Sequence, residues 1–205
     1  MIKKYNYVPF LDDGDVVDYN NYMYWPDVFS HDECNKIISI GTSRKLSAGL
    51  VESDKTGDKT VYDESNTVRR SKIAWLGFDE ETSWIYEKIH EYANYANVQN
   101  GWNFRLYGFL DGLQFTEYNS EYKGHYNYHN DLIKNPTARK LSCVVQLSDE
   151  DDYTGGEFEI FGLTGVPKKR GTIIFFPSFL VHKVTPVTSG IRYSLVSWIA
   201  GPKFI

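Results

Sequence analysis

From about residue 103 onward, this 205-residue chain reads as a succession of short strands separated by turn residues, with no helical segment between them. Turn residues cluster at 151–156 and 186–190, where Gly, Pro, Asp, Ser and Thr favour reversals of the chain. Many strands without interleaved helices indicate an antiparallel sandwich or barrel. We therefore expect a mainly β fold with supporting helices, a double-stranded β-helix of the jelly-roll, cupin-like kind. The expected strands are 104–109, 113–118, 124–130, 140–147, 157–161, 171–176, 182–184 and 192–199.

The first half of the chain is expected to supply two helices that brace one face of the barrel. Ser30 is followed three residues later by Glu33, the spacing of a capping box, which predicts a helix over 31–41. Apolar residues at Trp84, Ile85, Ile89 and Tyr92 have the spacing of an amphipathic helix over 80–95.

The length and a hydrophobic content of 41% are those of one domain with a full core. We expect a single domain over 1–205, with an N-terminal arm at 1–25, a helix-containing support region at 26–112 and the barrel core, with its candidate metal ligands, at 113–202. The segment 51–67 is polar, which is typical of a long functional loop such as a lid.

Charge and cysteine content narrow the classes of partner and compartment. The net charge is −5 without a basic block, so we expect neither nucleic acid nor an anionic membrane as a partner. Only two cysteines occur, Cys34 and Cys143, which suits a reducing compartment. No signal peptide or membrane span is recognisable, and the expected location is the cytoplasm.

The candidate metal ligands begin with His129 and Asp131, two residues apart in an expected strand and the turn after it. Side chains at this spacing share one face of an extended chain. A third ligand is available at His182, after an apolar strand and a Pro-Ser turn. Two histidines and one carboxylate are typical of non-haem Fe(II) oxygenases. Taken alone, a His-x-Asp pair is common, and a histidine among apolar neighbours is often a core residue.

An arginine follows ten residues after His182. Alternation along the last strand places Arg192, Ser194, Val196 and Trp198 on one face. If that face points into the barrel, Arg192 needs an anionic partner because an unpaired buried charge is very costly. The neighbouring sequence offers no obvious carboxylate, which favours a bound carboxylate ligand and hence an acidic cosubstrate.

The pattern His129-x-Asp131, His182 and Arg192 resembles the signature of the 2-oxoglutarate and Fe(II)-dependent dioxygenases. Further motifs resemble the prolyl 4-hydroxylase-like branch, the PKHD-type hydroxylases, over roughly residues 25–202. These motifs are Arg70-Ser71, Gln114 with Tyr118, Gly124-x-Tyr126, Leu141-Ser142 with Gln146-Leu147-Ser148, Asp152-Tyr153-x-Gly155-Gly156, Phe176-Pro177-Ser178, Trp198 and Gly201-Pro202.

The resemblance implies a set of cofactors and the residues that bind them. His129, Asp131 and His182 would bind Fe(II). Arg192 would pair with the distal carboxylate of 2-oxoglutarate, in a pocket shared with Ser194, Tyr118 and Gln146. Dioxygen is the further cosubstrate, ascorbate is a candidate reductant, and substrate hydroxylation would be coupled to conversion of 2-oxoglutarate to succinate and CO2.

For the substrate, the resemblance favours a prolyl residue in a peptide or protein. Tyr126, Trp198 and Arg70 match positions on the substrate side, and the loop 51–67 matches in location a loop that closes over the peptide. Free proline, a lysyl side chain and an alkylated base remain as alternatives, and the acidic balance counts against the base. A non-catalytic cupin-like binding module is the alternative from another class.

Overall fold

Two antiparallel β-sheets and two long helices make up the computed structural model, which describes residues 21–49, 68–132, 137–163 and 165–204. The elements in chain order are β1 (Met23–Trp25), α1 (His31–Ser43), β2 (Ser47–Ala48), β3 (Arg69–Arg70), β4 (Lys72–Leu76), α2 (Ser83–Gln99), β5 (Gly108–Phe109), β6 (Leu113–Asn119), the 3-10 turn η3 (Ser120–Tyr122), β7 (His125–His129), β8 (Thr137–Gln146), β9 (Tyr153–Gly155), β10 (Phe158–Ile160), β11 (Ile173–Pro177), β12 (His182–Val184) and β13 (Val187–Pro202).

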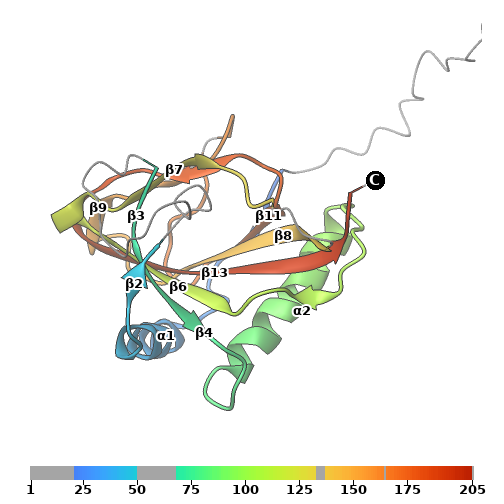
Figure 1. The fold of residues 1–205 in the computed structure, drawn as a ribbon, viewed down its shortest axis with the longest axis horizontal. Helices are drawn as coiled ribbons and strands as arrows, with labels where there is room; N and C mark the ends of the chain where they lie inside the picture. Colours follow the sequence, from blue (N-terminus) through green and yellow to red (C-terminus); the bar gives the residue numbers. More distant parts are fainter. Residues whose placement is uncertain (1–20, 50–67, 133–136, 164, 205) are drawn as a thin grey trace, which may run out of the picture.

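The larger sheet has the strand order β1-β11-β8-β13-β6-β4-β2, and β5 and β9 pair with β13 beside this path. The smaller sheet has the order β10-β12-β7-β3. Figure 1 shows β3 and β7 of the smaller sheet above the larger one, with α1 and α2 below it. The long strand β13 lies between β6 and β8 in the larger sheet.

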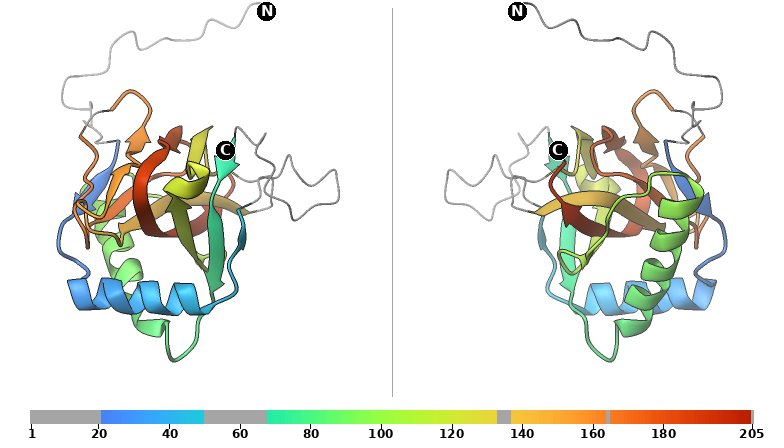
Figure 2. Two further views of the ribbon diagram at one scale, coloured as in Figure 1. Left: turned by 90° about the vertical axis from the view of Figure 1, so that its left-hand side faces the viewer. Right: turned by 90° about the vertical axis from the view of Figure 1, so that its right-hand side faces the viewer.

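The helices cover the face of the larger sheet that points away from the smaller one (Figure 2). Helix α1 begins with a capping box, because the Ser30 hydroxyl accepts from the Glu33 N–H while the Glu33 carboxylate accepts from the Ser30 N–H. The buried faces of α1 and α2 pack on strand residues such as Phe115, Phe175 and Leu195 in one apolar cluster. The two helices therefore stiffen the larger sheet, whose other face points toward the smaller sheet.

A second apolar cluster lies between the sheets. Its members include Tyr118 and Phe176 from the larger sheet and Phe158 and Val184 from the smaller one. The cluster fills only part of the space between the sheets, and polar side chains gather beside it.

The jelly-roll prediction is confirmed, and so are both helices. Helix α1 ends two residues later than expected, and α2 begins three residues later and ends four residues later than expected. Two predicted turns are partly strands instead, because Tyr153–Gly155 of β9 pairs with the start of β13 around a bulge. Each segment thereby supplies the other's backbone hydrogen bonds. The expected strand over 104–109 is reduced to Gly108–Phe109.

Some predictions concern residues that the structure does not describe, and others are tested only in the described part of the chain. The expected lid at 51–67 and most of the arm at 1–25 lie outside the described residues. Within the described part of the chain, no helix has the length and apolar character needed to cross a membrane. Both cysteines are buried and carry free thiols.

Candidate metal centre and its cavity

The three predicted metal ligands come together at one end of the smaller sheet. His129 is the last residue of β7, and His182 is the first residue of β12. These strands are neighbours, and the two histidines are paired directly across them. Asp131 follows two residues after His129 in the segment that leaves β7.

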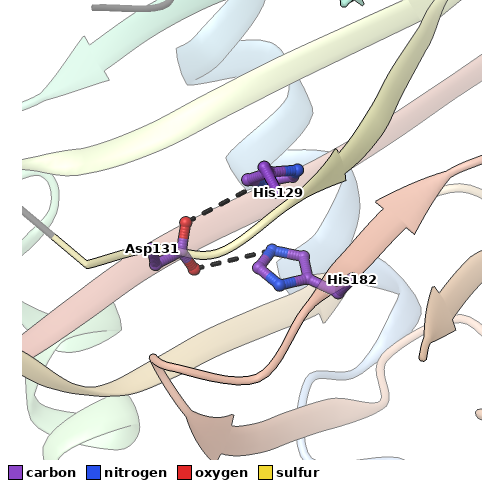
Figure 3. A group of neighbouring side chains, drawn as sticks. All are labelled: His129, Asp131 and His182. Carbon is purple, nitrogen blue, oxygen red and sulfur yellow. Dashed lines mark ion pairs between the residues drawn. The ribbon is translucent and has the colours of Figure 1, made fainter. Parts of the chain in front are cut away.

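The side chains of these residues point toward one another, with the Asp131 carboxylate facing both imidazoles (Figure 3). Asp131 Oδ1 lies 3.9 Å from His129 Nε2, and Asp131 Oδ2 lies 3.6 Å from His182 Nε2. One ligand atom from each residue lies within 4.8 Å of the other two. The arrangement is suited to a divalent ion with two imidazole ligands and one carboxylate ligand, and with further positions open.

Backbone carbonyls orient both imidazoles. His129 Nδ1 lies 2.8 Å from the Asn127 carbonyl oxygen, and His182 Nδ1 lies 2.9 Å from the Leu180 carbonyl oxygen. A carbonyl only accepts, so each Nδ1 carries the hydrogen and each Nε2 keeps a free lone pair. This is the tautomer that a metal-binding histidine requires.

Electrostatics keep the site in its metal-binding protonation state. Burial lowers the pKa of His129 to about 4, and the neighbouring His182 adds to that effect. Burial alone would raise the pKa of Asp131, but His182, His129 and the Ser142 hydroxyl outweigh it and hold the pKa below its usual value. A neutral imidazole at His129 and an ionised carboxylate at Asp131 are therefore present together at neutral pH.

The triad opens into a cavity of about 420 Å³ between the two sheets. The larger sheet contributes residues from β4, β6, β8, β11 and β13, and the smaller sheet contributes residues from β3, β7, β10 and β12. The cavity contains all four residues that alternation along the last strand placed on one face, Arg192, Ser194, Val196 and Trp198.

Arg192 is the largest fully buried side chain of the described residues, with 1% of its surface exposed. Its Nη2 donates to Gln146 Oε1 at 2.8 Å, and its Nη1 donates to Ser194 Oγ at 3.4 Å. Both partners are neutral, and no described carboxylate forms an ion pair with Arg192. The buried Nε–H has no hydrogen-bond partner among the described residues.

The unpartnered Nε–H and the unpaired charge of Arg192 indicate whether a carboxylate ligand would fit beside it. A buried guanidinium without an anion is costly, and a carboxylate can accept two parallel hydrogen bonds from it. The inner end of the cavity therefore fits a carboxylate group beside Arg192, in the same cavity as the three candidate metal ligands.

The other residues predicted to bind the cosubstrate take two different positions. Ser194 and Tyr118 line the cavity, and the Tyr118 ring lies 5.5 Å from the Arg192 guanidinium. Gln146 is not among the lining residues, since its carbonyl oxygen accepts from Arg192 and its NH2 donates to the Pro167 carbonyl at 3.0 Å. Its direct contact with a cosubstrate stays a prediction.

The predicted substrate-binding residues Tyr126 and Trp198 also line the cavity. The Tyr126 ring is stacked on the His129 imidazole, with centroids 3.4 Å apart, and burial raises the pKa of Tyr126 to about 12. Arg70 is not a lining residue, whereas Arg69 is. Ser71, which favoured Arg70 in the sequence, accepts from Arg69 Nε at 2.7 Å.

Arg139 is a cavity residue that the sequence did not indicate. Its guanidinium lies 3.8 Å from the centre of the Trp198 ring and donates to Asp111 Oδ2 at 2.7 Å. Arg139 lies near the start of β8, two residues before the Leu141-Ser142 motif but outside it, and one sequence gave no signal for its role.

Comparisons with known proteins agree with this geometry. Residues 113–200 match the family model described as the 2OG-Fe(II) oxygenase superfamily, and this range contains the three candidate metal ligands and Arg192. Over these residues the chain is similar to the 2OG-Fe(II) oxygenase superfamily. The description of this family names 2-oxoglutarate and Fe(II), the cosubstrate and the metal that the sequence motifs led us to expect.

Curated relatives of this chain carry the description PKHD-type hydroxylase. One from Teredinibacter turnerae is 44% identical over 62 residues, which cover 29% of this chain and 27% of the relative. One from Azoarcus sp. is 37% identical over 89 residues, which cover 38% and 39%. The matched regions thus span between about a quarter and two fifths of these relatives.

Solved structures with the same fold are matched over most of their length. A prolyl-4-hydroxylase from Pseudomonas putida superposes with a TM-score of 0.67 at 19% identity, covering 93% of this chain and 97% of that one. A viral collagen prolyl hydroxylase from Paramecium Bursaria Chlorella virus-1 gives 0.66 at 22% identity, covering 91% and 99%. At this identity the likeness establishes the fold.

Proposed function

We propose that this oxygenase hydroxylates prolyl residues in a peptide or protein, using Fe(II), 2-oxoglutarate and O2. One observation carries the proposal: the His129, Asp131 and His182 triad shares a single cavity with Arg192, a buried cation that lacks a counter-ion among the described residues. A metal ligand set and a carboxylate receptor in one cavity are what this chemistry requires.

The bound Fe(II) and its cosubstrates would supply the oxidising chemistry, in which substrate hydroxylation is coupled to decarboxylation of 2-oxoglutarate to succinate and CO2. The chain itself holds the ligands in place. His129 and His182 offer Nε2 because their Nδ1 atoms are bonded to carbonyls. Arg192 fixes the far carboxylate, and the apolar walls around it, including Phe176 and Val144, keep bulk water from the inner end of the cavity.

The walls on the substrate side support a proline-containing peptide. Tyr126 and Trp198 present aromatic rings beside the metal ligands, a suitable surface for a pyrrolidine ring. Arg69 and Arg139 line the same cavity and offer donors for peptide carbonyls. Proteins named prolyl hydroxylases share the fold, and one from Trichoplax adhaerens was solved with a peptide fragment, with a TM-score of 0.68 at 18% identity over 88% of this chain and 83% of that one.

The test is succinate release by the whole chain with Fe(II) and 2-oxoglutarate in air, with and without a panel of proline-rich peptides. Each peptide is then analysed by mass spectrometry for one added oxygen and the position of that oxygen. The control is His182→Ala, which removes one metal ligand. We expect succinate that rises only with a peptide and oxygen on its proline, and neither with the variant.

Other outcomes separate the alternatives. Peptide-independent succinate that free proline stimulates would move the substrate to the amino acid, and stimulation by a lysyl peptide or an alkylated base would move it to those substrates. If the iron-loaded chain releases no succinate, the result would favour the interpretation of this protein as a non-catalytic, cupin-like binding module.

A further inference from the structure

Two serines behind the Asp131 carboxylate form a buried chain of hydrogen bonds that the proposed reaction does not use. Ser142 Oγ lies 2.6 Å from Asp131 Oδ2 and 3.0 Å from Ser178 Oγ. Both serines have 0% of their surface exposed, and Asp131 has 8%. Neither serine lines the cavity, so neither can contact a cosubstrate or a substrate there.

The number of hydroxyl hydrogens determines which group donates in each of these hydrogen bonds. An ionised carboxylate only accepts, so the single hydroxyl hydrogen of Ser142 goes to Asp131. Ser142 must then accept from Ser178 across the remaining contact. Successive hydrogen bonds of this kind polarise and strengthen each other in a buried setting.

The same serines join three separate segments of the chain. Ser142 belongs to β8 of the larger sheet, and Ser178 lies in the turn after β11, four residues before His182. The Ser178 carbonyl also accepts from the Asp131 N–H at 2.9 Å, and the Ser178 N–H donates to the Lys140 carbonyl at 3.0 Å. Ser178 therefore holds the Asp131 backbone and, through Ser142, its side chain.

We propose that Ser142 and Ser178 are positioning residues for the metal: they fix the Asp131 carboxylate so that it presents one defined oxygen edge to the ion held by His129 and His182. Ser142 occupies a lone pair of Oδ2. This inference rests on the metal site of the proposed function. Groups that orient a ligand in this way typically change metal affinity by 10–100-fold.

Each substitution should weaken metal binding because it leaves the Asp131 carboxylate freer to move. Without the Ser142 hydroxyl, the carboxylate can rotate and must be ordered again when the metal binds. Without the Ser178 hydroxyl, Ser142 still donates to Asp131 but no longer accepts a hydrogen bond itself. We therefore expect Ser142→Ala to weaken metal binding by roughly 10–100-fold, and Ser178→Ala to give a smaller loss in the same direction.

The chain offers a matched control at Ser197. It is equally buried and lies on β13 beside Trp198, which lines the cavity, so alternation directs Ser197 to the other face. Its register partner is Cys143, the neighbour of Ser142. Ser197→Ala therefore removes a buried hydroxyl from the same sheet without touching Asp131.

The experiment is calorimetric titration of the whole chain with Mn2+, a redox-stable probe for a site of this ligand type. Thermal unfolding without metal is recorded for every variant. A purely structural role would lower the melting temperature of Ser142→Ala while leaving the Mn2+ affinity of the folded protein unchanged. Ser142→Thr, which retains the hydroxyl, should recover most of the affinity.

The expected result is weaker Mn2+ binding in Ser142→Ala and Ser178→Ala, with Ser197→Ala equal to the wild type. If Ser142→Ala does not fold, Ser178→Ala carries the test, because it leaves the direct bond to Asp131. Wild-type affinity in the folded serine variants would overturn this inference and leave the proposed function intact. A wild-type chain that binds no Mn2+, or binds it equally after His182→Ala, would overturn both.

Discussion

His129 and His182 are direct cross-strand partners in the smaller sheet, and their ring centroids are 4.2 Å apart. Their separation is therefore set by the pairing of β7 with β12 rather than by flexible loops. Asp131 lies two residues after His129, just beyond the end of β7, and its carboxylate faces both imidazoles. A site built on paired strands is largely formed before any ion binds.

The first prediction concerns loss of one imidazole. His182→Ala should abolish Mn2+ binding and reduce succinate release to background, because two ligands remain where three were held. The fold should persist, with a change in stability of about 1 kcal/mol. The measurements are calorimetry, succinate release and thermal unfolding. His90→Ala, at an exposed position on α2, is the control, and full activity of His182→Ala would remove His182 from the ligand set.

The second prediction concerns the buried guanidinium. Arg192→Ala should raise the KM for 2-oxoglutarate at least roughly 100-fold, because breaking a buried charge pair costs roughly 3–5 kcal/mol. The ligand should also raise the melting temperature of the wild type and not that of the variant. Arg44→Ala, which removes an exposed ion pair with Glu81, should behave as the wild type. An unchanged KM in Arg192→Ala would contradict the role assigned to Arg192.

The positions of the motif residues could be predicted from the sequence, because strand alternation and helix capping determine where their side chains point. Alternation along β13 placed Arg192 and Trp198 on one face, and the structure places both in the cavity. The Ser30 and Glu33 capping box set the start of α1 correctly. These features depend on neighbours two or three residues apart in the chain.

The sequence was insufficient where the chain changes sheet or register. Alternation from Ser142 and Val144 would place Lys140 in the cavity, but the register of β13 and β8 shifts between Ile199 and Ala200. Arg139 lines the cavity as a result, while Lys140 lies 3.3 Å from the Phe204 ring centre.

A similar change of sheet explains the position of Arg69. The chain passes from β3 in the smaller sheet to β4 in the larger one at Ser71, so alternation cannot be carried across from the second strand. The sequence favoured Arg70 on the strength of Ser71 as its neighbour. In the structure the side chain of Ser71 is bonded to Arg69 instead. Bulges and crossovers of this kind depend on contacts between distant segments, which one sequence does not reveal.

The third prediction concerns the thiols. Burial raises the pKa of both Cys34 and Cys143, and the thiolate is the reactive form. Iodoacetamide should therefore label neither cysteine at neutral pH in the native protein, whereas both should react in guanidinium chloride. Peptide mass mapping after short labelling gives the result. Fast labelling of Cys143 in a chain that is still folded would contradict its burial.

The fourth prediction concerns the start of α1. Burial alone would raise the pKa of Glu33, but hydrogen bonds from Lys88 and from Ser30 hold it below its ordinary value of 4.5. A carboxyl group with a lowered pKa stabilises the fold above its ordinary pKa, and that contribution is lost as the pH falls through the folded value. Glu33→Gln should therefore lower the free energy of unfolding at pH 7 by roughly 0.2–1 kcal/mol, because solvent screens the charge at this partly exposed position.

The pH dependence separates this effect from lost packing. The stability difference between Glu33→Gln and the wild type should shrink below pH 4.5 and vanish at lower pH, as measured by urea unfolding. A difference that stays constant from pH 7 into the acid range would show that the charge of Glu33 is not its cause. Asp32→Asn, in the same first turn but outside the capping box, is the control.

The last prediction uses two glycines in the same backbone conformation. Gly156 has φ +65°, and a Cβ there would lie 3.1 Å from Arg192 Cδ and 2.9 Å from Val187 Cγ2. Gly162 has φ +80°, and a Cβ there would meet nothing within 4 Å. Alanine at either position adopts a left-handed conformation that costs about 1–2 kcal/mol, but only Gly156→Ala presses on the arginine.

In urea unfolding, both alanine variants should therefore lose about the same stability through backbone strain, and Gly156→Ala should lose a further amount through its close contacts. Only Gly156→Ala should raise the KM for 2-oxoglutarate severalfold. The shared loss of stability serves as the internal control, because it shows that backbone strain by itself leaves the cosubstrate site intact. Equal KM values for the two folded variants would mean that Arg192 does not need the space that Gly156 leaves. A raised KM in Gly156→Ala alone would show that the fit of the cosubstrate depends on the placement of the guanidinium as well as on its charge.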